Sequence, residues 1–351
     1  MEISTNKALQ RICERFANNP FSSQLTLRIE SDAGSSFFYS ESGLDVPSFI
    51  ASSTKTFLSE LFLQLHEGQH LSINAPVARY LPETQLRGLN TFGKQDNFEK
   101  FTLSHLLRNT SGIPDYYRSK ALKMGKDISE RTAKDPGWTY EETLSIARTK
   151  KAKFAPGTRA EYSFTNYQIL SELAEVVLSE PLNRSLDRLI FNKLKLENTY
   201  LFSKEDTAKF ASVAPLLFRK QSYLGANRMA SLRGEGAIVS STADTMAFLK
   251  YFVNKRLGEG HDQQILGETR KLYPGVAYGQ GLMEIRVPKS LSGFRKVPLA
   301  VGHLGATGHF MVFVPTLGVY VVGTVNQLAS PLLSVKFLGE ILSTLQTNSK
   351  S

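Results

Sequence analysis

The stretch Phe49-Ile50-Ala51-Ser52-Ser53-Thr54-Lys55-Thr56 lies where an extended segment passes into an apolar helix. Ser52 and Lys55 have the S-x-x-K spacing. Residues i and i+3 share one face of a helix, so the Lys55 amine can reach the Ser52 hydroxyl. A serine at a helix start also has free backbone N–H groups beside it, and these can hold developing negative charge. The positive end of the helix dipole favours the neutral lysine, which is the form that can take a proton.

The same pattern has a simpler interpretation, which is an N-capping serine followed by a surface lysine. In a chain with this many serines, about one S-x-x-K sequence is expected by chance. Whether Ser52 and Lys55 form a catalytic pair therefore depends on partners elsewhere in the sequence.

Secondary-structure signals surround this stretch on both sides. Before it, the apolar spacing predicts a helix over residues 5–16 and strands over 24–30 and 37–39. After it, a helical period continues from Ser52 until Gly68 ends the run. A long, mostly helical middle then follows to about residue 230.

The C-terminal part of the chain returns to strands. We expect a helix near residues 243–252, strands at about 276–286, 297–303, 308–314 and 319–326, and a final helix near 332–345. Strands at both ends with helices between them predict one antiparallel sheet completed by both termini, flanked by the terminal helices. The expected fold is of the mixed α/β (α+β) class. Residues 1–50 and 231–351 would form the sheet, 51–230 the helical insertion, and the active site would lie in the cleft between them.

The composition is ordinary for a soluble globular protein, with 41% hydrophobic and 21% charged residues in 351. A length above what one core usually holds favours two packed units or one domain with a large insertion. The net charge is +10, and much of it comes from residues 118–134 and 148–153, where acidic residues are interleaved. The open interpretations are a solvated basic face, a patch for nucleic acid or membrane, and steering of anionic substrates. Neither aromatic interleaving nor a helix-turn-helix pattern supports nucleic acid.

The cysteine count and the hydropathy of the sequence further limit the classes of protein to which the chain can belong. The single cysteine, Cys13, excludes an internal disulfide and is expected to be a buried small hydrophobe. The most apolar stretch, 310–325, is interrupted by Pro315-Thr316-Leu317-Gly318, so no membrane span is expected. Residues 1–7 lack the pattern of a signal peptide. This predicts a cytoplasmic protein if Met1 is the native start, and a periplasmic or secreted one if a leader was removed.

Two further segments carry candidate catalytic chemistry. Tyr162 lies in a turn-rich loop ahead of a helix, where it can relay protons or simply pack and hydrogen-bond. His303 lies in Gly302-His303-Leu304-Gly305-Ala306-Thr307-Gly308, whose glycines indicate close backbone approach, as a substrate along a sheet edge needs. A hairpin with a hydrogen-bonded histidine is the alternative there. The histidines lack metal-ligand spacing among themselves, and neither a metal nor another cofactor is implied.

Together these segments resemble the penicillin-recognising serine hydrolases, in particular the group of class C β-lactamases, D-alanyl-D-alanine carboxypeptidases and carboxylesterases. Residues 49–56 are similar to the nucleophile helix of that family. Tyr162-Ser163-Phe164 stands at its Tyr-x-Asn position, and His303-Leu304-Gly305 at its Lys-Thr-Gly or His-x-Gly position. Further similar segments follow in the family's order, and the resemblance covers about residues 20 to 345.

The resemblance implies a β-lactamase-like fold and covalent catalysis. Ser52 would attack an acyl carbonyl, and Lys55 with Tyr162 would remove its proton and later protonate the leaving group. Which of the two is the base stays open. The backbone N–H groups of Ser52 and Ala306 would form the oxyanion hole, and water would release the acyl group. His303, Leu304, Gly305 and Phe164 are the expected substrate-binding residues.

Two departures from the family's pattern bear on the substrate, which we expect to be a small ester or amide. Phe164 replaces an asparagine whose amide would hold the lysine and a substrate carbonyl, and a phenyl ring offers neither interaction. Leu304 replaces a hydroxyl residue that would bind a substrate carboxylate. Both changes favour carboxylic esters, or acyl transfer, over β-lactams and D-Ala-D-Ala peptides.

Two alternatives remain. One is β-lactamase or D-alanyl-D-alanine carboxypeptidase activity, and another is a catalytically weak homologue that acts as a binding or regulatory module. An α/β-hydrolase would need a G-x-S-x-G sequence, which does not occur. The sequence leaves the oligomeric state open.

Overall fold

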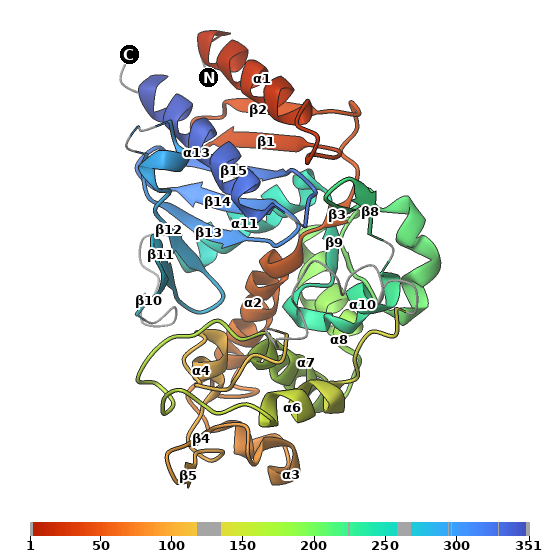
Figure 1. Ribbon diagram of the computed structural model, residues 1–351, viewed down its shortest axis with the longest axis vertical. Coiled ribbons are helices and arrows are strands. Elements are labelled where there is room, and N and C mark those ends of the chain that lie inside the picture. The colour runs from red at the N-terminus through yellow and green to blue at the C-terminus, as the bar shows by residue number, and fades with distance from the viewer. Residues whose placement is uncertain are drawn as a thin grey trace.

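A computed structural model describes residues 3–117, 135–223, 225–257, 268–293, 295, 297–328 and 330–348. The expected basic stretch at 118–134 lies outside these described residues. Both termini lie at the same end of the molecule, beside the sheet, and the helical region forms the opposite end (Figure 1).

The main sheet has eight antiparallel strands in the order β10-β11-β12-β13-β14-β15-β1-β2. The N-terminal hairpin supplies two strands, β1 (Thr26–Ser31) and β2 (Ser36–Ser40). The C-terminal part supplies β10 (Arg270–Tyr273), β11 (Val276–Tyr278), β12 (Met283–Ile285), β13 (Ala300–Leu304), β14 (His309–Val314) and β15 (Val319–Thr324). The expected fold, a sheet completed by both ends of the chain around a mostly helical insertion, is confirmed.

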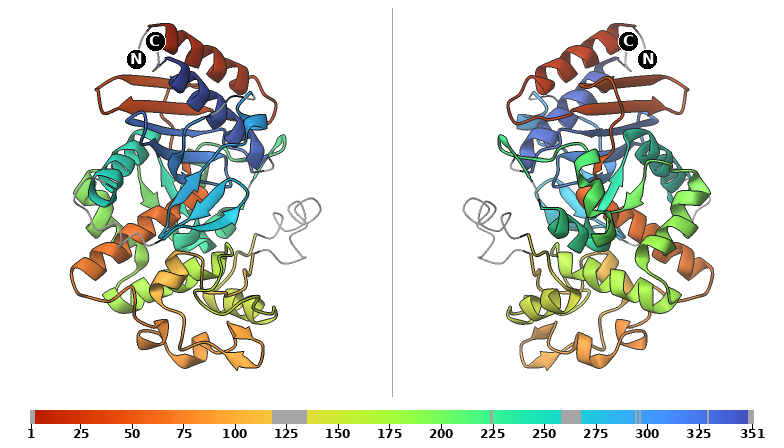
Figure 2. Two further views of the ribbon diagram at one scale, coloured as in Figure 1. Left: turned by 90° about the vertical axis from the view of Figure 1, so that its left-hand side faces the viewer. Right: turned by 90° about the vertical axis from the view of Figure 1, so that its right-hand side faces the viewer.

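Helices cover both faces of this sheet (Figure 2). The helices α1 (Ile3–Ala17) and α13 (Pro331–Asn348) share one core with Phe310 and Val312 of β14. On the other face, Met311 packs in the core that contains α11 (Thr242–Arg256). Successive side chains of a strand point to opposite faces, so a strand buried on both faces is a continuous apolar run, as the Phe-Met-Val-Phe-Val sequence of β14 is.

The nucleophile segment leads from the sheet into the helical region. The short strand β3 (Ser48–Phe49) passes into a single 3₁₀ turn, η1 (Ala51–Ser53), and then into α2 (Thr54–Glu67), which lies in the middle of the molecule (Figure 1). Eleven of the fourteen residues of α2 are buried, so this helix is a core element rather than a surface one.

Shorter elements make up the rest of the helical region. Before residue 118 they are η2 (Val77–Arg79), α3 (Glu83–Leu86), β4 (Thr91–Phe92), β5 (Gln95–Asp96) and α4 (Leu103–Leu107). From residue 135 on they are α6 (Tyr140–Arg148), α7 (Phe164–Leu178), α8 (Leu182–Leu186), the π-helical turn η4 (Asp187–Phe191), α9 (Asn192–Leu194), β6 (Tyr200–Leu201) and η5 (Lys204–Ser212). The hairpin β7 (Leu217–Phe218) and β8 (Gln221–Ser222), α10 (Ala226–Ser231), η6 (Arg233–Glu235) and β9 (Ile238–Ser240) complete the region, and η7 (Lys289–Leu291) follows in the sheet part. The strands β3, β9 and β6 form a separate three-stranded sheet.

The single strand predicted over residues 276–286 is wrong, because the chain turns back within it. Strands β11 and β12 pair with each other, and Gly279 closes the turn by donating its N–H to the Leu282 carbonyl at 2.9 Å. A Cβ on Gly281 would lie 2.4 Å from the Cβ of Ser59, so the turn packs directly against α2. Thr56 and Ser59 of α2 also donate hydrogen bonds to the carbonyls of Gly281 and Gln280. This docking of the hairpin onto the nucleophile helix is a tertiary feature that strand periodicity does not predict.

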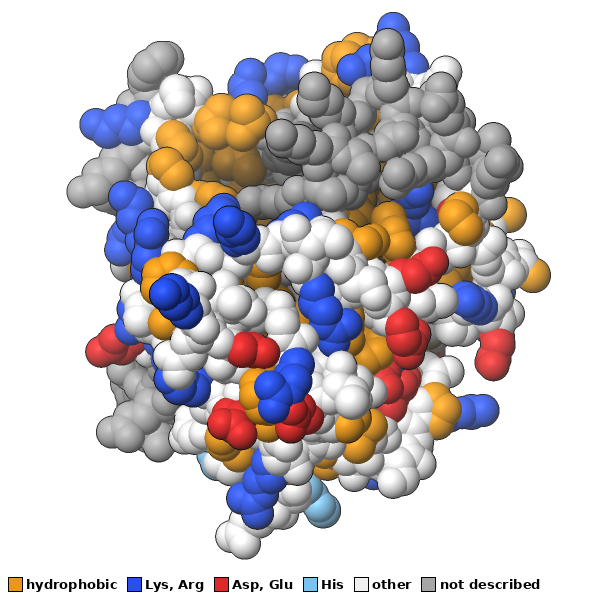
Figure 3. All heavy atoms as spheres, turned by 60° about the horizontal axis from the view of Figure 1, so that its bottom comes forward, with side chains coloured by type: hydrophobic (Ala, Val, Ile, Leu, Met, Phe, Trp, Pro, Cys, Tyr) orange, Lys and Arg blue, Asp and Glu red, His pale blue; other side chains and the backbone are white. Residues whose placement is uncertain are grey.

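Charged side chains of both signs are mixed over the end of the molecule opposite the termini (Figure 3). Lys and Arg side chains on this face have Asp and Glu side chains between them, as on an ordinary solvated face. Among the described residues, none of the helices is long and apolar enough to cross a membrane.

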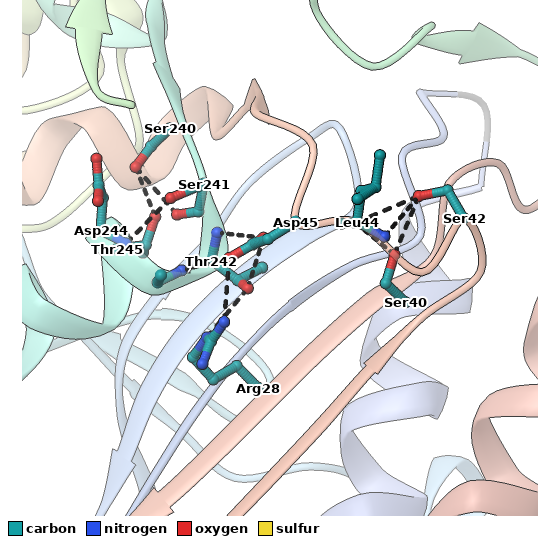
Figure 4. A network of polar contacts seen from close by, with 11 residues as sticks. Arg28, Ser40, Ser42, Leu44, Asp45, Ser240, Ser241, Thr242, Asp244 and Thr245 are labelled. Atoms are coloured by element: carbon teal, nitrogen blue, oxygen red, sulfur yellow. Dashed lines mark hydrogen bonds and ion pairs between the residues drawn. The ribbon is translucent and has the colours of Figure 1, made fainter. Parts of the chain in front are cut away.

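Asp45 ties the segment that precedes the nucleophile to helix α11 (Figure 4). Its carboxylate accepts hydrogen bonds from the backbone N–H groups of Thr242 and Ala243, both at 2.9 Å, and from the Thr242 hydroxyl at 2.8 Å. Arg28 of β1 forms an ion pair with the same carboxylate at 3.2 Å. Asp45 therefore accepts hydrogen bonds from the free N–H groups at the start of α11. It also holds the chain segment that leads to Ser52 against that helix.

Replacing Asp45 with alanine is expected to lower the free energy of unfolding by about 1–3 kcal/mol, because two backbone donors at the start of α11 lose their acceptor. Urea unfolding followed by circular dichroism measures the change. Asp45→Asn keeps an acceptor oxygen and loses only the charge, so its loss should be smaller. A free energy of unfolding for Asp45→Ala within about 0.5 kcal/mol of wild type would contradict the capping role.

Candidate active site

Ser52 is the middle residue of the one-turn helix η1 and is only 6% exposed. The preceding residue, Ala51, has a left-handed backbone with φ 47°, a conformation that costs a non-glycine residue energy and turns the chain sharply. The residue at the N-cap of α2 is Ser53, and its side chain makes no capping hydrogen bond. Ser52 is therefore not held as an N-capping residue.

Lys55 is fully buried, which excludes the interpretation as a surface lysine. Its Nζ donates a hydrogen bond to the Ser52 Oγ at 3.3 Å and another to the backbone carbonyl of Glu235. The rings of Phe164, Tyr167 and Tyr162 surround it, with their centroids 4.5, 5.1 and 5.2 Å from Nζ. The Phe164 ring thus does contact the lysine, through its face, where the family's asparagine would offer an amide. The Glu235 carbonyl supplies the hydrogen bond.

Burial lowers the pKa of Lys55 from 10.5 to about 7, against the opposing effect of the nearby Glu235 and Asp115 carboxyls. Near neutral pH a substantial fraction of the amine is therefore neutral and able to accept a proton from Ser52.

Tyr162 is buried in the loop before α7, with its ring edge-on to those of Phe164 and Tyr278 at 5.5 and 5.8 Å. Burial raises the pKa of its hydroxyl well above 10, and the neighbouring Ser52 hydroxyl lowers that pKa only in part. The Tyr162 oxygen makes no hydrogen bond of good geometry to any described residue. Tyr162 is therefore a neutral phenol beside the serine, with a proton free to donate.

The turn after β13 lies against the nucleophile segment. Gly308 donates its N–H to the Gly305 carbonyl at 3.0 Å, and the Thr307 hydroxyl donates to the Phe49 carbonyl at 2.7 Å. A Cβ on Gly305 would lie 2.5 Å from the Ile50 carbonyl oxygen, so only glycine permits this approach. Within the described part of the chain the Ala306 N–H gives no backbone hydrogen bond in this turn. It remains available beside Ser52, as an oxyanion hole requires.

His303 and Leu304 lie off the pocket beside Ser52. The Nε2 of His303 is 3.1 Å from the Tyr278 hydroxyl, which in turn lies 3.2 Å from that of Tyr167. Burial lowers the pKa of His303 to about 3, so the ring is neutral. Leu304 packs on the core of the sheet. Direct contact of His303, Leu304 or Gly305 with a substrate stays a prediction, whereas Phe164 does line the pocket.

The pocket itself is narrow, with a volume of about 100 Å³. Ser52 and Ala306 lie in its wall, together with apolar and aromatic side chains from α10, the β7–β8 hairpin and the loops. Its other lining residues are Ala51, Tyr117, Phe164, Phe218, Tyr223, Arg228, Met229, Leu232, Glu235, Gly236, Thr307 and Leu328.

Two charged residues of this lining, Glu235 and Arg228, were not predicted from the sequence. Glu235 is fully buried, accepts a hydrogen bond from the Tyr116 hydroxyl at 2.6 Å, and keeps its second carboxyl oxygen without a partner among the described residues. Burial raises its pKa well above 4.5, which favours the neutral acid. Its position between Gly234 and Gly236 is the one sequence signal, since flanking glycines indicate close packing around a charged residue.

The described residues contain no group of three or more His, Cys, Asp or Glu side chains that could hold a metal ion. What the arrangement offers is a serine hydroxyl, a buried amine that can take its proton, and free backbone N–H groups next to it. These are the requirements of an acyl-enzyme mechanism, and they define the class of serine hydrolases with a serine–lysine pair.

The chain belongs to the β-lactamase family, whose family model matches residues 45–336. The D-alanyl-D-alanine-carboxypeptidase/endopeptidase AmpH of Escherichia coli (strain K12) is 24% identical over 313 residues, which cover 85% of this chain and 75% of that protein. A putative D-alanyl-D-alanine carboxypeptidase of Salmonella agona (strain SL483) is 26% identical over 155 residues, covering 43% of this chain and only 33% of the relative. The match therefore spans about a third of that relative's length. The resemblance seen in the sequence motifs is confirmed.

Solved structures show the same fold. The D-amino acid amidase from Ochrobactrum anthropi SV3, complexed with L-phenylalanine amide, has a TM-score of 0.78 at 19% identity, covering 99% of this chain and 100% of that one. EstCE1, a hydrolase with promiscuous acyltransferase activity, has a TM-score of 0.68 at 17% identity, covering 96% and 98%. At these identities the likeness shows the fold alone.

Proposed function

We propose that this β-lactamase-family hydrolase cleaves small carboxylic esters, or transfers their acyl group, through a covalent intermediate on Ser52. The observation that carries the proposal is the Phe164 ring, which lies in the pocket wall and over the Lys55 amine where the family's motif has an amide. An ester with an apolar part needs no amide donor at that position, and its alkoxide leaves more readily than an amine.

The mechanism follows from the charges and distances at the site. Neutral Lys55 accepts the Ser52 proton as the hydroxyl oxygen attacks the ester carbonyl. The N–H groups of Ser52 and Ala306 stabilise the oxyanion. Tyr162, a neutral phenol, donates a proton to the departing alkoxide, and the tyrosinate so formed takes back the proton that Lys55 received from Ser52. Water then attacks the acyl-enzyme by the same path in reverse, and an alcohol in place of water would give acyl transfer.

Peptide or amide hydrolysis is the second candidate, and the relative named AmpH favours it through a match over most of this chain. The apolar wall at Phe164 opposes it, since an amide substrate loses a hydrogen-bond partner there. The third candidate, a catalytically weak binding module, is opposed by the serine–lysine hydrogen bond and the lowered pKa of Lys55.

The purified protein is expected to hydrolyse 4-nitrophenyl butyrate with a kcat/KM at least 10-fold, roughly, above that for the β-lactam nitrocefin, because a missing polar contact costs an amide-bearing substrate about one order of magnitude. Initial rates of both substrates, followed by absorbance, measure the ratio. In Phe164→Asn the ratio should shift toward nitrocefin. Faster turnover of nitrocefin than of the ester by wild type would refute the ester proposal.

A further inference from the structure

Arg228, on α10, carries a buried guanidinium in the wall of the pocket that contains Ser52. The residue is 5% exposed. It lines both this pocket and an adjoining open hollow of about 750 Å³, so its side chain lies between the nucleophile's pocket and solvent. A buried arginine normally has a carboxylate partner, because burying an unpaired charge is costly.

No such partner is present in the described part of the chain. None of its carboxylates lies within ion-pair distance of the Arg228 guanidinium. Asp135 is close to the same helix, but its two oxygens accept the backbone N–H groups of Asn227 and Arg228, at 2.6 and 3.0 Å. Glu235, in the same pocket, has a raised pKa that favours its neutral form. Among the described residues, the neutral hydroxyl of Tyr223 interacts with the guanidinium.

The orientation of Arg228 is set by an aromatic ring. Its guanidinium carbon lies 4.7 Å from the centroid of the Trp138 ring. An arginine guanidinium has a planar fork of N–H groups that can bind a carboxylate with two parallel hydrogen bonds. The Trp138 ring covers one side of the guanidinium and leaves these N–H groups as the means of binding an anion with two oxygens.

We propose that Arg228 binds a carboxylate carried by the substrate, so that the preferred esters have a negatively charged group at the far end of an apolar chain. The apolar wall of Phe164, Met229 and Leu232 would hold the chain, and the guanidinium would hold its end. This inference rests on the proposed ester hydrolysis, and it names the substrate class of that site. It also supplies a binding site for the carboxylate at a new position, since Leu304 replaces the hydroxyl residue of the family's Lys-Thr-Gly motif.

The test compares matched ester pairs that differ only in charge. In the acyl series, 4-nitrophenyl hydrogen adipate is compared with 4-nitrophenyl hexanoate. In the alcohol series, 3-carboxyphenyl butyrate is compared with 3-methylphenyl butyrate. We expect wild type to prefer the anionic member of one series by roughly 10- to 100-fold in kcat/KM, mainly through KM, because a charge-assisted bidentate contact is of that size. The series that shows the preference identifies the half of the ester that occupies the pocket.

The variant Arg228→Met keeps an apolar side chain over Trp138 and removes the charge, and its preference should fall to near unity. Lys204→Met is the matched control, because Lys204 is exposed and lines the outer hollow but not the pocket that contains Ser52, and it should retain the wild-type preference. If Arg228 had only a structural role, its replacement would lower the stability of the protein but would not change the ratio of kcat/KM between the charged and the neutral ester. Equal kcat/KM for both members of each pair in wild type, or a preference that survives in Arg228→Met, would overturn the proposal.

A binding measurement separates failure of this inference from failure of the esterase proposal. Monomethyl adipate should bind the Ser52→Ala protein more tightly than methyl hexanoate by the same roughly 10- to 100-fold, as measured by isothermal titration calorimetry. If neither ester class is hydrolysed but this difference is found, the esterase proposal fails and Arg228 still binds a carboxylate. Hydrolysis without any difference in binding refutes the role of Arg228 alone. Arg228→Lys provides a second variant if Arg228→Met does not fold, and it should retain part of the preference.

Discussion

The variant Ser52→Ala is expected to lose essentially all turnover, with kcat falling by roughly 10⁴- to 10⁶-fold, because the proposed acyl-enzyme forms on the Ser52 oxygen. Fluorophosphonate labelling, followed by intact mass, should add one probe per wild-type chain and none to the variant. The melting temperature should stay close to that of wild type, since the Ser52 hydroxyl caps no helix and its removal leaves only a small gap.

Ser53→Ala is the matched control, because it removes the neighbouring hydroxyl on the same turn. Ser53 points away from the pocket and lies 2.9 Å from the Nδ1 of His309 in the buried core. This variant should be less stable than wild type but should still be labelled. Labelling of Ser52→Ala as strong as that of wild type would show that the nucleophile lies elsewhere.

The second large effect concerns Lys55, whose lowered pKa of about 7 gives the reaction a definite pH dependence. Only the neutral amine accepts the Ser52 proton, so the active fraction rises with pH and levels off above the pKa. We expect kcat/KM for a neutral ester to fall about tenfold for each pH unit below pH 7 and to be flat above it until another group ionises. Stopped-time or continuous assays in constant ionic strength measure the profile.

Lys55→Met keeps the length of the side chain and removes the amine, and it should lower kcat by roughly 10²- to 10⁴-fold, the usual contribution of a general base. Its residual rate should lose the step near pH 7. A wild-type profile that is flat between about pH 5 and pH 9 would show that Lys55 is not the base. Burial raises the pKa of Tyr162 well above 10, which favours its neutral phenol near neutral pH, so the proposed mechanism assigns the role of base to Lys55.

The structure shows a contact of Phe164 that the sequence did not predict. In the sequence, Phe164 stands where the family's motif has an asparagine, so its side chain lacks the amide. In the structure its ring is one of three around the Lys55 amine, and the Glu235 carbonyl provides the hydrogen bond that the amide would have given. The lysine is therefore held in place although the motif is incomplete.

The fold could be predicted from the sequence because its signals are local and repeated. The strand pattern at both ends and the apolar period of the helix from Ser52 to Gly68 each depend on neighbours a few residues away, and they set the order of elements. The single strand predicted at 276–286 is wrong, because the chain turns back at Gly281. This turn packs against α2, and strand periodicity does not predict such a tertiary contact. Ser52 and Lys55 were candidates because the S-x-x-K motif has a fixed spacing, and Tyr162 was a candidate because the family resemblance aligns it with the Tyr-x-Asn motif. Their catalytic roles stay predictions.

The sequence alone determined the presence of a serine–lysine pair and the chemical types available to it, since these depend on spacing along one helix. Only the tertiary structure decided the state of those groups and the shape of the pocket. The pKa of Lys55 depends on burial by rings from α7 and its preceding loop, and the roles of Glu235 and Arg228 depend on their meeting Ser52 from about 180 residues further along the chain. Burial and charge pairing are sums over the residues that surround a group in space, and those residues are distant in sequence.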